Sequence, residues 1–123
     1  MKRSIPILLY HHVSPDREIT PDVLEKQLRH LLNDGFESLS MEDVLATVEG
    51  RRHSQKPGFA VTFDDGYLDN WLCAFPVLQK LGVKAAFYLV TDRVESHAAP
   101  RRMPGSLDTR SHERDSGGFM SWP

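Results

Sequence analysis

Residues 59–67 of this 123-residue chain read FAVTFDDGY. The residues up to Phe63 are mostly β-prone and fit a strand that is buried on both faces, as in a parallel sheet. Asp64 and Asp65 then stand at the carboxyl end of that strand, where α/β proteins build their sites. Because successive side chains of an extended strand point in opposite directions, one carboxylate can hold a metal ion while its neighbour acts as a base. The alternative is a solvated turn before Gly66.

Composition narrows the class of protein. The chain is 40% hydrophobic and 26% charged, which is ordinary for a single globular domain of this length. Its net charge of -2 gives no reason to expect nucleic acid as a partner. Cys73 is the only cysteine, so no intrachain disulfide can form, and its apolar neighbours predict a buried thiol. The apolar run before His11 is too short for an export signal or a membrane span, so the chain is cytoplasmic only as written and its localisation stays open.

Strand and helix patterns alternate along the first three quarters of the chain. Thr20 and Pro21 are typical of a helix start, and Ser40 with Asp43 predicts a capping box. Pro76 is expected to break or restart the helix that follows the acids. The alternation favours an α/β fold with parallel strands. The pattern predicts strands over 5–10, 59–63 and 84–90 and helices over 21–33, 41–48 and 70–81.

The remainder of the chain differs in character. Residues 93–118 are rich in Arg, Ser, His, Gly and Pro and have hardly any periodic apolar positions. We therefore predict a two-part organisation, with an α/β unit over 1–92 and a low-order loop or tail over 93–123. Residues 121–123 are typical of a helix start, which suggests a truncated chain.

Three segments together resemble a known family. They are TFDDGY at residues 62–67, LGVKAAFYLV at 81–90 and PILLYHHV at 6–13. The chain resembles the polysaccharide deacetylase family, which has the chitooligosaccharide deacetylase homology domain and is also called carbohydrate esterase family 4. The opening segment is similar to the branch with the poly-N-acetylglucosamine deacetylases. The resemblance covers roughly residues 4–92 and implies the N-terminal portion of a distorted (β/α) barrel.

The resemblance also implies a reaction, namely metal-dependent removal of acetyl groups from an N-acetylated oligo- or polysaccharide. Asp64 then corresponds to the general base, and Asp65 corresponds to a ligand of a divalent metal, with zinc as the first candidate. The backbone N–H of Tyr67 corresponds to a donor to the developing oxyanion. His11, and with less weight His12, follow the first strand, so one of them is a candidate for the same mouth. The alternative is that one histidine packs or hydrogen-bonds locally while the other is solvated. This chemistry is sound, because a metal polarises the carbonyl while a carboxylate takes the proton of water.

The family pattern is incomplete in this sequence. The family supplies two further metal ligands from a His-Ser/Thr-x-x-His motif, and no two of the six histidines have that spacing. The remaining candidates, His97 and His112, stand in the predicted tail. We therefore expect an incomplete metal site, a chain that is inactive alone, and self-association through exposed strand edges.

Two other functions remain open at this point. One is a non-catalytic carbohydrate-binding remnant of the same family. The other is a different metal-dependent hydrolase, such as a phosphatase. Haloacid-type phosphatases need Asp-x-Asp, and the acids here are adjacent, so the phosphatase is disfavoured.

Overall fold

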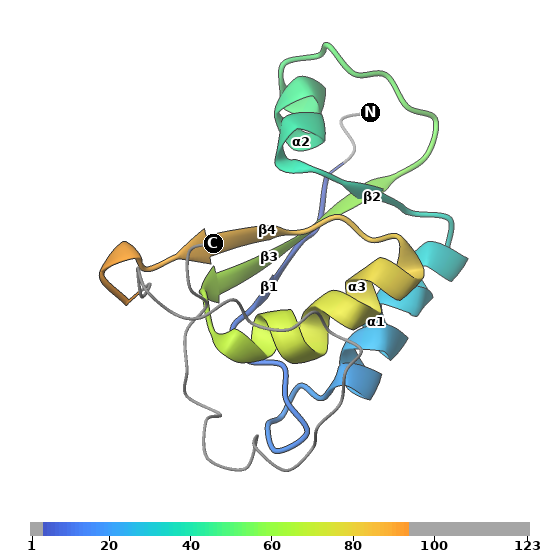
Figure 1. Cartoon of the computed structure of the whole chain (residues 1–123). Coiled ribbons are helices and arrows are strands. Elements are labelled where there is room, and N and C mark those ends of the chain that lie inside the picture. The colour runs from blue at the N-terminus through green and yellow to red at the C-terminus, as the bar shows by residue number, and fades with distance from the viewer. Residues whose placement is uncertain (1–3, 94–123) are drawn as a thin grey trace.

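A computed structural model of the chain describes residues 4–93 (Figure 1). The strands are β1 (Ile7–Tyr10), β2 (Glu37–Leu39), β3 (Gly58–Asp65) and β4 (Ala86–Leu89). The helices are α1 (Pro21–Asn33), α2 (Met41–Val48) and α3 (Phe75–Leu81); a π-helical turn, η1 (Asn70–Ala74), precedes α3, and a 3-10 turn, η2 (Thr91–Arg93), follows β4.

The sheet is built around β3, which pairs in parallel with each of the other strands. β1 lies along one edge of β3, while β2 and β4 follow one another along the opposite edge. The predicted α/β class with parallel strands is therefore confirmed. β3 runs through both acids, beyond the predicted end at Phe63, whereas β1 and β4 are shorter than predicted.

The helix predictions are confirmed in extent, and the last one differs in form. The Thr20 hydroxyl accepts a hydrogen bond from Val23 N at 3.3 Å at the start of α1, and the capping box of Ser40 and Asp43 opens α2. The helix predicted over 70–81 is divided into η1 and α3. Pro76 lies in the first turn of α3, where its missing N–H costs no intrahelical hydrogen bond.

The hydrophobic core lies on one face of the sheet. Figure 1 shows α1 and α3 side by side against this face, with α2 beside β2 and away from them. Core residues from the sheet and these two helices are Phe59, Val61, Phe63, Leu24, Leu28, Val77 and Leu78. On the opposite face Ile7 and Leu9 are each 56% exposed and Tyr88 is 53% exposed. Self-association through exposed strand edges stays a prediction.

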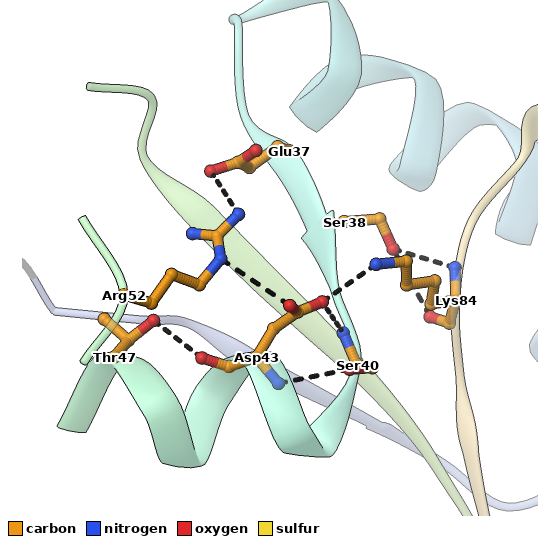
Figure 2. A network of polar contacts seen from close by, with 7 residues as sticks. All are labelled: Glu37, Ser38, Ser40, Asp43, Thr47, Arg52 and Lys84. Carbon is orange, nitrogen blue, oxygen red and sulfur yellow. Dashed lines mark hydrogen bonds and ion pairs between the residues drawn. The ribbon is translucent and has the colours of Figure 1, made fainter. Parts of the chain in front are cut away.

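A polar cluster fastens α2 and the start of β4 to β2 (Figure 2). The Asp43 carboxylate accepts hydrogen bonds from the Ser40 backbone at 3.0 Å and from Lys84 Nζ at 2.8 Å. It also lies 3.6 Å from Arg52 Nε, and Arg52 in turn pairs with Glu37 at 3.0 Å. The hydrogen bonds from Lys84 and, after it, from Ser40 hold the pKa of Asp43 far below its ordinary value. The cluster therefore stabilises the packing of α2, β2 and the segment before β4 against one another.

Some of the residues named above lie outside the part of the chain that the structure describes. The predicted tail, including His97 and His112, lies outside residues 4–93 apart from its first residue. Within 4–93 no helix is long and apolar enough to cross a membrane.

Candidate active site

The two acids stand at the carboxyl end of β3, as predicted, and both are partly exposed. In the register Asp64 lies opposite Tyr88 of β4. Neighbours in register on parallel strands point the same way, so Asp64 shares the open sheet face with Tyr88 and Leu9. Within residues 4–93 the Asp64 side chain makes no hydrogen bond or ion pair. The Asp64 carboxylate therefore lies at the end of β3 with no partner among these residues.

The backbone leaves the strand in an unusual way at the second acid. Asp65 has a φ of 73°, in the left-handed region that residues other than glycine seldom occupy. The prediction that both acids sit on extended backbone is therefore wrong for Asp65, whose direction is set by the turn. Gly66 follows with a φ of 68°, and a Cβ there would lie 2.7 Å from Leu89 Cδ2. The positive φ and the close approach of β4 together favour glycine at position 66.

His11 reaches this strand end, as predicted. Its Nε2 lies 4.0 Å from Asp65 Oδ2, with the side chains 52% and 36% exposed. That distance is too long for a hydrogen bond, so the contact is a loose, solvent-accessible pairing. The structure brings His11 and Asp65 together without locking either side chain.

His12 is the more firmly held of the two histidines. Its Nδ1 lies 2.7 Å from Asp69 Oδ2, and its ring stacks on Tyr67 with centroids 3.7 Å apart and planes 24° apart. Asn70 Nδ2 donates to the His11 carbonyl at 2.7 Å and to Asp69 Oδ1 at 3.1 Å. Asp69 and Asn70 were not predicted as site residues, since in the sequence they look like ordinary polar residues in a helical pattern. Only the pairing of β1 with β3 brings them to the histidines.

Cys73 lies in surroundings that favour a structural thiol over a nucleophile. It is half-buried against the core, and burial first, then the charges of Asp69 and Asp16, raises the pKa of its thiol. A raised pKa keeps the thiol protonated and unreactive at neutral pH.

The described residues do not make a complete metal centre. Within residues 4–93 no group of three or more His, Cys, Asp and Glu side chains could hold a metal ion. Asp65 and His11 offer two ligands at most, whereas a catalytic zinc takes about three from the protein.

Comparison with known proteins identifies the family. The family model described as polysaccharide deacetylase matches residues 51–115, which include the acid-bearing strand. The chain belongs to the polysaccharide deacetylase family. Among curated proteins, YxkH of Bacillus subtilis, which carries the name of a polysaccharide deacetylase, is 33% identical over 89 residues, or 70% of this chain and 32% of that protein.

Solved deacetylases share the fold. The deacetylase PplD from Streptococcus pyogenes, solved with acetate, is 28% identical with a TM-score of 0.69, covering 80% of this chain and 48% of that one. IcaB from Ammonifex degensii is 25% identical with a TM-score of 0.67, covering 83% of this chain and 46% of that one. The chain thus spans half or less of the length of these relatives. The likeness supports the prediction of the N-terminal portion of a (β/α) barrel.

Proposed function

We propose that this protein is an enzyme that removes acetyl groups from an N-acetylated polysaccharide. Family membership supports the class of reaction, and the deacetylase PplD, which shares the fold, was solved with acetate, the product that such a reaction releases. The observation that carries the proposal is the end of β3, where an uncommitted Asp64 is followed by a left-handed turn at Asp65 and Gly66. An unpaired carboxylate at a rigid, partly exposed strand end has the placement that proton transfer requires.

Asp64 is the general base in this proposal. It accepts the proton of the attacking water, and because the strand fixes its position, little reorganisation precedes the transfer. The backbone N–H of Tyr67 is the donor that we assign to the developing oxyanion, since the turn at Asp65 and Gly66 brings the backbone round at the same strand end.

Asp65 is proposed as one ligand of a divalent metal, zinc first, with the remaining ligands supplied from outside residues 4–93. When bound, such a metal polarises the acetamide carbonyl and lowers the pKa of water. Because the described residues offer only part of the set, we expect residues 1–123 alone to release no measurable acetate from N-acetylglucosamine oligomers, even with added zinc.

The test uses the complete gene product that carries this sequence and measures acetate release together with bound metal. Asp64→Asn should lower turnover by about 100- to 10,000-fold and leave the metal content unchanged, because a base is lost but not a ligand. Asp65→Asn should lower the metal content itself. Full activity in Asp64→Asn, or unchanged metal in Asp65→Asn, contradicts the assigned roles. Saccharide binding without any turnover in the parent protein would support the carbohydrate-binding alternative instead.

A further inference from the structure

His12 and Asp69 form a short, partly buried contact between two distant parts of the sequence. Asp69 is 8% exposed and His12 is 23% exposed, and the two lie 57 residues apart in the sequence. The pairing is short, at 2.7 Å, whereas the exposed pair of His30 and Asp34 at the end of α1 is 3.6 Å apart. The contact therefore fixes a histidine ring that still reaches solvent.

Asn70 holds the carboxylate of Asp69 from the other side. Its side-chain amide donates to Asp69 Oδ1 and to the His11 carbonyl, and the residue is fully buried. Its own Oδ1 has no hydrogen-bond partner among the described residues. Asn70 also opens the π-helical turn η1, a backbone form often found at functional sites.

The hydrogen bond decides which nitrogen of His12 carries the proton in the neutral ring. An ionised carboxylate only accepts hydrogen bonds, so Nδ1 must be the donor to Asp69 and Nε2 must carry the lone pair. The stack on Tyr67 fixes the plane of the ring as well. The second nitrogen is therefore a fixed hydrogen-bond acceptor on the loop after β1, beside the loop that follows the two acids.

We propose that Asp69 is a positioning residue that presents His12 Nε2 as the acceptor for a hydroxyl or amide N–H of the saccharide. This role rests on the proposed deacetylation for its substrate, whereas the tautomer of His12 can be measured without any substrate. Because the contact is made to bound substrate before and during reaction, its loss should raise KM and leave kcat nearly unchanged.

The first experiment reads the tautomer of His12 by long-range ¹H–¹⁵N spectra of the labelled 123-residue chain, at a pH high enough for neutral imidazoles. The parent should show Nδ1–H for His12. In Asp69→Asn, the new amide oxygen should keep accepting from Asn70, so the amide nitrogen should face His12 and switch it to Nε2–H. Asp34→Asn is the matched control, and it should leave the tautomer of His30 unchanged. Nε2–H in the parent, or the same tautomer in Asp69→Asn, overturns the positioning role.

The second experiment measures kinetics of the complete gene product on a soluble N-acetylglucosamine oligomer. Asp69→Asn should raise KM by about tenfold, the loss of one hydrogen bond, with kcat within about threefold of the parent. Should Asp69→Asn fail to fold, His12→Gln and His12→Phe replace it, because Gln keeps an acceptor whereas Phe keeps only the flat ring. His12→Gln should keep a KM near that of the parent, whereas His12→Phe should raise the KM.

The outcomes separate this proposal from the proposed function. A fall in kcat with unchanged KM overturns the substrate contact, as does a zinc-dependent shift of the His12 Nε2 signal, which would make it a metal ligand. Absence of acetate release in the parent counts against the proposed function, while the tautomer spectra still decide whether Asp69 positions His12.

Discussion

Asp43, beside β2, and Asp64, at the far end of β3, are both partly exposed carboxylates, and the fold treats them in opposite ways. Asp43 accepts hydrogen bonds from Lys84 and Ser40, which hold its pKa well below the ordinary value, and it also faces Arg52 (Figure 2). Asp64 has no such partner within residues 4–93. A carboxylate surrounded by fixed donors is committed to the architecture, whereas one left unpaired at a strand end remains available for chemistry.

The same contrast applies to two glycines with positive φ. Gly66, just after β3, has a φ of +68°, and a Cβ there would lie 2.7 Å from Leu89 Cδ2, whereas Gly50, after α2, has a φ of +73° and nothing within 4 Å of such a Cβ. Gly66→Ala should therefore lower the free energy of unfolding by about 1–3 kcal/mol, and Gly50→Ala should cost less because only the backbone is strained. Denaturant unfolding of both variants measures the difference. Equal losses would mean that Leu89 moves aside and that the acid end of β3 is not tightly shaped.

A smaller loss of stability is expected from the polar cluster. Asp43→Ala removes one side of the capping box and the charge partner of Lys84 and Arg52, so the midpoint of thermal unfolding should fall. Asp64→Ala is the matched control, and its midpoint should stay at the parent value, since its side chain holds nothing together. A larger fall for Asp64→Ala would reverse the distinction between the two carboxylates.

The smallest effect is the dependence of stability on acid. The folded state lowers the pKa of Asp43, so its stabilising contribution is fully present above the unfolded value of about 3.9 and is lost as the pH falls through the folded value. The difference in stability between the parent and Asp43→Asn should therefore be larger at about pH 6 than at about pH 2.5. Urea unfolding at the two pH values measures it. A difference that does not change with pH would show that the charge of Asp43 contributes nothing.

Local signals in the sequence predicted much of the fold. α1 and α2 have the predicted bounds because their starts depend on neighbouring residues, Thr20 with Pro21 and Ser40 with Asp43. β2 was missed, since a three-residue strand shows no alternation and is defined only by its pairing with β3. Tertiary context, not local pattern, makes it a strand.

The candidate site could be predicted only in part for a related reason. Asp64 and Asp65 were found because a run of apolar residues leads directly into them. The left-handed backbone of Asp65 has no local signature, because aspartate tolerates that region without requiring it. The contact between His12 and Asp69 joins residues 57 positions apart, so it exists only once β1 lies beside β3.

We propose that Asp64 serves the reaction whereas Asp43 serves the fold. The most direct test is the initial rate of acetate release by the complete gene product carrying Asp64→Asn, beside the same protein carrying Asp43→Asn, at a temperature where both are folded. We predict a rate about 100-fold or more below the parent for Asp64→Asn and a rate equal to the parent for Asp43→Asn. A parental rate in Asp64→Asn, or an equal loss in both variants, would contradict the account.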